Sequence, residues 1–100
     1  MTRTLVLHPA IRGQQGPEDA AARLAEAQAL TRALPGLEQV GGETVWLSRP
    51  HPATLLGAGK VGEIGARIGA AEIGLVIMNG PLSPVQQRNL EREWKAKVLD

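Results

Sequence analysis

Residues 73–78 read Ile-Gly-Leu-Val-Ile-Met, a continuous apolar run that is ended by Asn79-Gly80-Pro81. A strand that is covered on both faces is apolar at nearly every position, which is typical of central strands in a parallel sheet. Consecutive parallel strands are joined by crossover connections, usually helices. Residues 73–78 therefore predict an α/β fold, provided that helices flank them.

A helix is expected on each side of this strand. Residues 60–71 carry apolar side chains at helical spacing, namely Val61, Ile64, Ile68 and Ala71. Downstream, Ser83 has the position of an N-cap, Pro84 takes the first helical position and Gln86 completes a capping box. Residues 97–100 begin a further strand.

The first half of the chain repeats this alternation. Residues 4–7 form a short apolar strand, and Pro17 opens a helix that is expected to end at about Leu34, before Pro35-Gly36. Residues 43–47 alternate polar and apolar, as a half-buried or edge strand does. The predicted core stripe of this helix is Ala20, Leu24, Ala27, Thr31 and Leu34.

The opposite side of the 17–34 helix carries alanines at intervals of three and four, Ala22, Ala25, Ala29 and Ala33. Exposed alanine is simply a good helix former. The alternative is that this side is a docking face for a part of the protein outside these 100 residues.

The predicted architecture is a small parallel sheet of about four strands with helices on both faces, in the order β-α-β-α-β-α-β. Residues 1–100 are expected to form one α/β domain. No internal repeat or low-complexity tract interrupts the order of elements.

The composition excludes several classes of protein. Hydrophobic residues make up 43% and charged residues 21% of the chain, as in packed globular domains. The net charge of +1 lacks the basic excess of a free-standing nucleic-acid binder. There is no cysteine for disulfides, thiolate zinc sites or cysteine nucleophiles. No signal peptide or membrane-spanning run is recognisable, so we expect a cytoplasmic protein.

The segment Gly57-Ala58-Gly59-Lys60-Val61-Gly62 is the first candidate site. It fails as a P-loop because Thr54 replaces the first glycine and Val61 replaces the magnesium-binding Ser or Thr. It matches G-x-G-x-x-G literally, but the acidic residue expected about 20 positions later is missing. A tight turn with close packing, or a phosphate held by helix-start amides and Lys60, are the remaining interpretations.

Three glycines, Gly62, Gly65 and Gly69, lie inside the 60–71 helix. Each costs roughly 1 kcal/mol of helix stability relative to alanine. Together they suggest that another backbone or a ligand approaches this helix closely.

The helix over 83–94 is strongly polar, and only Val85, Leu90 and Trp94 are expected to be buried. A solvated helix, supported by a Glu91–Lys95 pair, is the simplest interpretation. The alternative is a recognition surface, since Gln, Asn and Arg side chains make specific hydrogen bonds.

Catalytic and metal-binding constellations are scarce. His8 and Ser48 follow neighbouring predicted strands, and the carboxyl ends of such strands carry the sites of α/β proteins. This pair lacks an orienting acid and an oxyanion hole, so we expect no catalytic residue. His8 and His51 are not at metal-ligand spacing with a carboxylate, so we expect no metal site.

Two stretches resemble motifs of one family. Residues 52–63, Pro-Ala-Thr-Leu-Leu-Gly-Ala-Gly-Lys-Val-Gly-Glu, resemble P-x-T-x-x-G-x-G-K-x-x-E. Residues 82–91, Leu-Ser-Pro-Val-Gln-Gln-Arg-Asn-Leu-Glu, resemble L-S-P-x-Q-x-R-N-L-E, and the apolar run at 73–78 lies between them. The chain thus resembles the N-terminal domain of the HflX-type ribosome-associated GTPases, whereas residues 1–50 match only in pattern.

The resemblance implies an accessory domain that helps a GTPase bind the large ribosomal subunit and its RNA, in splitting or rescue of ribosomes. It implies a helical hairpin and a G domain that lie outside these 100 residues; GTP and Mg²⁺ are expected only in that G domain. The alternative is nucleotide binding by this domain itself. The candidate nucleotide- or phosphate-binding residues are Gly57, Gly59, Lys60, Gly62 and Glu63, and the candidate RNA or partner contacts are Ser83, Gln87, Arg88 and Asn89.

Overall fold

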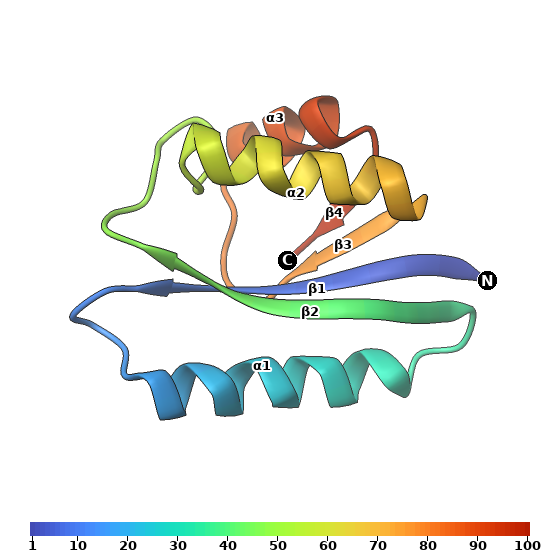
Figure 1. Ribbon diagram of the computed structural model, residues 1–100, viewed down its shortest axis with the longest axis horizontal. Coiled ribbons are helices and arrows are strands. Elements are labelled where there is room, and N and C mark those ends of the chain that lie inside the picture. The colour runs from blue at the N-terminus through green and yellow to red at the C-terminus, as the bar shows by residue number, and fades with distance from the viewer.

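The computed structural model describes all 100 residues and confirms the predicted order of elements. Its four strands form one parallel sheet in the order β2-β1-β3-β4. Helix α1 lies on one face of the sheet, and α2 and α3 lie on the other (Figure 1). The elements are β1 (Thr2–Ile11), α1 (Pro17–Arg32), β2 (Leu37–Leu47), α2 (Ala58–Ala71), β3 (Leu75–Met78), α3 (Pro84–Trp94) and β4 (Lys97–Leu99).

Strands β1 and β2 are longer than predicted because they pair with each other along their whole length, from Thr2 opposite Leu37 to Ile11 opposite Leu47. Pro9 is tolerated inside β1. The Asn79 N–H donates to the Leu7 carbonyl, so odd-numbered residues of this part of β1 direct their backbone groups toward β3. Because β3 ends at Met78, no residue of β3 lies opposite Pro9. The missing N–H of the proline therefore costs no strand hydrogen bond.

The main core lies between the sheet and the α2/α3 layer. Alternation along β1 sends Leu5 and Leu7 into this core, whereas Thr4, Val6 and His8 are buried under α1. Helix α1 buries only small side chains, Ala20, Ala27 and Thr31, which lets it lie close to the sheet. The two faces of the sheet therefore pack against layers of different thickness.

Two predicted core residues are exposed. Leu34 is 51% exposed because α1 ends at Arg32 and Leu34 belongs to the turn that follows. Val85 is 52% exposed because α3 packs through Leu90 and Trp94, and Val85 lies about 140° around the helix from Leu90. The predicted alanine face of α1 is exposed, and Leu24 is half-buried.

Candidate functional site

The predicted glycine turn forms the start of α2. Gly57 is the N-cap with an extended backbone, no side chain caps the helix, and the first turn contains no acidic residue. The first amides of α2 are therefore left without a side-chain partner, at the positive end of the helix dipole. Gly57, Gly59, Lys60, Gly62 and Glu63 all lie within the N-cap and the first turns of this helix.

Lys60 is paired with two carboxylates. Its Nζ lies 2.6 Å from Glu43 Oε2, on β2, and 3.1 Å from Glu63 Oε1, one helical turn away. Glu43 also accepts a hydrogen bond from Arg67. A phosphate at the start of α2 would therefore have to compete with Glu43 and Glu63 for this ammonium group.

The same network shifts two pKa values. The hydrogen bond to Glu43 raises the pKa of Lys60 above its usual value. Partial burial acts to lower this pKa, and the hydrogen bond to Glu63 raises it further. Burial by itself would raise the pKa of Glu43, but the hydrogen bonds and charges of Lys60 and Arg67 together lower it. Both groups are thus held in their charged forms. Sequence reasoning missed Glu43 because only the tertiary fold brings β2 beside α2.

Of the three glycines inside α2, one has a close neighbour. A Cβ at Gly65 would lie 3.3 Å from Cδ1 of Trp94, on α3, whereas a Cβ at Gly62 or Gly69 would meet nothing within 4 Å. The prediction of a close approach is confirmed at Gly65 only, and the approaching group is the Trp94 side chain rather than another backbone. Helices α2 and α3 therefore meet at Gly65.

The start of α3 has the predicted capping box. Ser83 Oγ accepts the Gln86 N–H at 3.1 Å, and Gln86 Oε1 accepts the Ser83 N–H at 2.9 Å. The Gln86 amide also donates from Nε2 to the His51 carbonyl at 3.0 Å. Ser83 and Gln86 thus stabilise the helix end, and Gln86 in addition holds the loop that precedes α2.

Two other polar residues of α3 bind backbone. Asn89 Nδ2 donates to the Ala53 carbonyl at 2.9 Å, and Gln87 Nε2 donates to the Val98 carbonyl at 2.6 Å. Arg88, between them, is exposed and has no hydrogen-bonding or ionic partner. Three of the four predicted contact residues, Ser83, Gln87 and Asn89, therefore have structural partners, and Arg88 is left free.

The two sequence motifs form one substructure. In the loop before α2, His51 and Leu55 exchange backbone hydrogen bonds of 2.9 and 2.8 Å, and Leu55 has a φ of 67°. The hydrogen bonds from Gln86 and Asn89 tie this loop to α3. Between the loop and α2 lies a hollow of about 440 Å³ lined by His51, Pro52, Ala53, Thr54, Leu56, Ala58, Val61, Gly62 and Glu93.

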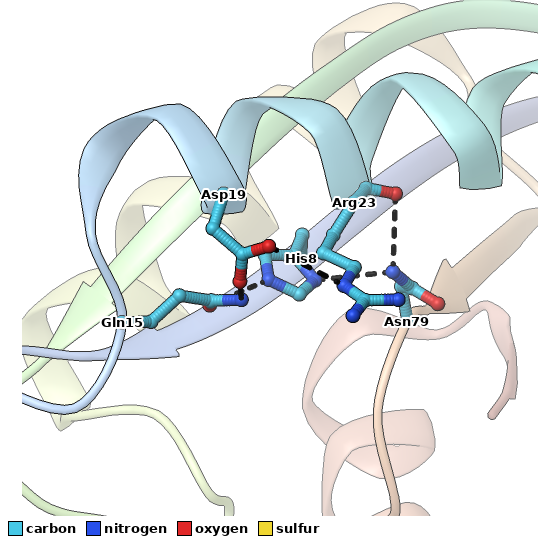
Figure 2. A network of polar contacts seen from close by, with 5 residues as sticks. All are labelled: His8, Gln15, Asp19, Arg23 and Asn79. Atoms are coloured by element: carbon cyan, nitrogen blue, oxygen red, sulfur yellow. Dashed lines mark hydrogen bonds and ion pairs between the residues drawn. The ribbon is translucent and has the colours of Figure 1, made fainter.

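A second polar cluster joins the ends of β1 and β3 to α1, and Figure 2 shows it. Asn79 Nδ2 lies 3.1 Å from His8 Nδ1 and 3.3 Å from the Arg23 carbonyl, so its amide group donates to both. His8 Nε2 lies 2.9 Å from Gln15 Oε1. Because Nδ1 accepts, Nε2 carries the ring proton and donates it to Gln15.

The rest of this cluster lies on α1 and in the turn before it: Gln15 Nε2 donates to Asp19 Oδ2 at 2.7 Å, and Asp19 Oδ1 lies 3.7 Å from Arg23 Nε. The cluster lies at the carboxyl ends of neighbouring strands whose connections leave to opposite faces, where open α/β sheets bind ligands. Here His8 is buried and both its ring nitrogens are engaged. Ser48 is exposed at the end of β2 and does not contact His8, so the structure does not form the Ser–His pair considered above.

Two further observations concern metals and membranes. No three His, Asp or Glu side chains come together in a group that could hold a metal ion. None of the helices combines the length and the apolar character that crossing a membrane requires.

Residues 21–100 match the model of a protein family described as GTP-binding GTPase N-terminal. The chain belongs to this family. The matched range contains both motifs and the loop-to-α3 hydrogen bonds between them, whereas His8 and Gln15 lie before it.

Several curated members of the family are named GTPase HflX. The chain is 39% identical over 82 residues to the protein from Magnetococcus marinus. This match covers 82% of this chain and 19% of that protein. It is 41% identical over 51 residues to the Escherichia coli protein, covering 51% of this chain and 12% of that one. It is 44% identical over 52 residues to the Lacrimispora saccharolytica protein, and this match covers 52% of this chain and 12% of that protein. The chain therefore spans less than a fifth of the length of these GTPases.

Proposed function

We propose that this chain is the N-terminal accessory domain of a ribosome-associated GTPase and helps that GTPase bind the large ribosomal subunit in the cytoplasm. The role is in splitting or rescue of ribosomes. GTP hydrolysis, with its GTP and Mg²⁺, belongs to a G domain elsewhere in the protein. Membership of the GTPase N-terminal family supports the link to a GTPase.

The observation that carries the proposal is the way the two motifs use their polar side chains. Gln86 and Asn89 hold the 51–55 loop against α3, which gives a rigid, solvent-facing surface. Arg88 is exposed and unpaired on that helix, and so is Arg92 one turn later. Free guanidinium groups on a rigid element suit contact with RNA phosphates.

The modest charge of the domain fits an accessory role. A net charge of +1 supplies little of the counterion release that drives strong RNA binding. Most of the affinity for the ribosome would therefore come from other parts of the protein, and this domain would add orientation and a few contacts.

Sedimentation of the complete protein with large ribosomal subunits tests the proposal. Reversal of charge by Arg88→Glu is expected to weaken binding by about tenfold at moderate salt, because a phosphate contact becomes repulsive. Arg32→Glu is the matched control, since Arg32 is an exposed, unpaired arginine on α1. Equal binding by the two variants would overturn the assigned surface. Failure of the wild-type protein to sediment with subunits would overturn the function.

A second candidate is nucleotide binding by this domain itself, over the Gly57–Gly62 turn. It is favoured by the start of α2, which has no side-chain cap and no acidic residue in its first turn, beside the 440 Å³ hollow. The pairing of Lys60 with Glu43 and Glu63 weighs against it.

Titration of the 100-residue chain with GTP and with ATP separates the two candidates. Nucleotide binding at the turn would shift the backbone amides of residues 57–62 in a saturable manner. It would also change the fluorescence of Trp94, whose indole donates to the Val61 carbonyl. Unchanged spectra at millimolar nucleotide would exclude the second candidate.

A further inference from the structure

One of the two tryptophans of the chain is left partly open to solvent. Trp94 is buried and its indole N–H is hydrogen-bonded, whereas Trp46, on β2, is only half-buried. The indole N–H of Trp46 makes no hydrogen bond within the chain, and no buried side-chain nitrogen or oxygen lacks a partner, so this group is open to water. A chain that has no Phe or Tyr thus exposes part of one of its two aromatic side chains.

The exposed part of Trp46 borders a hollow at the carboxyl edge of the sheet. The hollow has a volume of about 400 Å³ and is lined by Arg12, Gly13, Gln15, Pro17 and Trp46. It lies where β1 and β2 end side by side and the chain enters α1 (Figure 1). Ligands of open α/β sheets bind at this edge.

The backbone fixes the two largest side chains of the hollow. Ala10 pairs with Trp46 in the sheet register, and the Arg12 N–H donates to the Leu47 carbonyl at 2.8 Å. Alternation along the two strands therefore directs Arg12 and Trp46 to the same face of the sheet, the face that carries α1. The hydrogen bonds of the sheet thus hold the two residues together without any ligand.

The charges at this edge are positive. Arg12 Cζ lies 6.0 Å from the centroid of the Trp46 ring, at the outer limit of a cation–π contact. Arg12 is exposed and has no ionic partner, and no acidic residue lines the hollow. Arg49, two residues beyond the end of β2, is likewise exposed and unpaired. The edge therefore presents two free guanidinium groups beside a flat aromatic ring.

A flat ring beside free guanidinium groups suits a nucleotide. An aromatic side chain binds a nucleobase by stacking, and a guanidinium group binds the phosphate. Resting on the proposed function, which brings the domain to ribosomal RNA, we infer that Trp46 is a stacking platform for one unpaired nucleotide of RNA. Arg12 binds the phosphate of that nucleotide, and Arg49 binds a neighbouring phosphate of the same strand.

An unpaired nucleotide suits the hollow better than a paired RNA helix or an acidic peptide. In a paired helix the bases are stacked on one another, so an indole reaches a base only in a loop, a bulge or an end. The carboxylates of an acidic peptide would bind the arginines but would offer nothing to the face of the Trp46 ring. A base with its phosphate uses both features of the hollow.

Fluorescence anisotropy with the complete gene product tests the inference. The probe is a fluorescein-labelled RNA of about eight nucleotides that cannot pair with itself. Trp46→Leu, which keeps an apolar side chain on β2, is expected to weaken binding by about tenfold, the loss typical of one stacked base. Trp46→Phe, which keeps an aromatic face, should bind within about threefold of wild type. A fully base-paired RNA should bind wild type and Trp46→Leu equally.

Arg12 offers a second variant with little risk to the fold, since its side chain is exposed. Arg12→Gln should weaken binding by about threefold to tenfold, and the slope of log affinity against log salt should fall by about 0.7, because one phosphate contact is lost. Arg32→Gln is the matched control. It removes the same charge from an exposed, unpaired arginine of α1 and should change the affinity by less than about twofold.

The outcomes separate this inference from the proposed function. Equal binding by wild type, Trp46→Leu and Arg12→Gln, or no binding by wild type, would overturn the stacking platform and leave unaffected the ribosomal role, which Arg88→Glu tests. Displacement of the RNA by an equal concentration of a mononucleotide or of an acidic peptide would assign the hollow to that ligand and would also overturn the inference. A wild-type protein that binds the RNA through Trp46 but does not sediment with ribosomal subunits would overturn only the proposed function.

Discussion

The indole N–H of Trp94 donates a hydrogen bond of 2.9 Å to the carbonyl of Val61, in the buried interface between α3 and α2. A Cβ at Gly65 would lie 3.3 Å from Cδ1 of the same indole. Because Trp94 is buried between the two helices, this contact sets how closely they approach each other. Of the three glycines inside α2, only Gly65 is therefore explained by packing against a neighbouring side chain.

The three glycines of α2 are predicted to respond differently to alanine. Gly62→Ala and Gly69→Ala should each raise the free energy of unfolding by about 0.5–1 kcal/mol, because alanine is the better helix former and the space is open. Gly65→Ala should give no such gain, because the buried Trp94 cannot move away from the added methyl group. Urea unfolding of the three variants measures this, and a gain at Gly65 equal to the others would contradict it.

The 51–55 loop is predicted to depend on Asn89. Asn89→Ala removes the hydrogen bond to the Ala53 carbonyl and should cost about 1 kcal/mol. The cost should appear as faster hydrogen exchange at the amides of His51 and Leu55, which bond to each other across the loop. Arg88→Ala is the control, because Arg88 has no partner. Equal exchange rates in both variants would show that the 51–55 loop is stable without the hydrogen bond from Asn89.

The parts of the fold that the sequence predicts are those with a local cause. The apolar run at 73–78 indicates a doubly covered strand, although Ile73 and Gly74 precede β3 in the structure. The Ser83–Gln86 capping box is made by residues three apart, and it forms as predicted. The first part of β2, Leu37 to Gly42, has no strand pattern and is a strand because β1 pairs with it.

The candidate site shows the same division. The proximity of Gly57, Lys60 and Glu63 follows from their spacing on one helix. The partners that decide what these residues do come from distant parts of the chain: Glu43 for Lys60, and Ala53 for Asn89. Side-chain type alone therefore marked Asn89 as a contact residue, whereas its amide is used to hold a loop.

The tautomer of the neutral His8 ring is predicted to follow from its neighbours. In the neutral ring, Nε2 should carry the proton and Nδ1 should be unprotonated, because the Asn79 amide donates one hydrogen bond to Nδ1 and another to the Arg23 carbonyl. The ¹⁵N shifts of the two ring nitrogens report the tautomer directly. A proton on Nδ1 would mean that the Asn79 amide is turned the other way.

Asn79→Asp should destabilise the domain by about 2 kcal/mol at neutral pH. The substitution removes both hydrogen bonds donated by the amide and places a carboxylate beside the Arg23 carbonyl. Thermal unfolding measures the loss, and Asp100→Asn serves as a comparison, since its new amide oxygen still accepts the Leu82 N–H. A loss no greater than that of Asp100→Asn would show that the His8 cluster adds little to stability.

The Lys60–Glu43–Arg67 network is predicted to make stability depend on pH in the acid range. The folded state lowers the pKa of Glu43 below its usual 4.5, so its contribution is fully present above that value and is lost as the pH falls through the lowered pKa. Glu43→Gln should therefore cost about 1 kcal/mol at pH 7, and the difference from wild type should shrink below pH 4.5. Lys60 has a raised pKa, so its contribution is lost only in alkaline solution, above its usual 10.5.

Urea unfolding between pH 3 and pH 8 measures the predicted loss of the Glu43 contribution in acid. Glu26→Gln, an exposed glutamate of α1 without a partner, should run parallel to wild type throughout, and parallel behaviour of Glu43→Gln would refute the network's role.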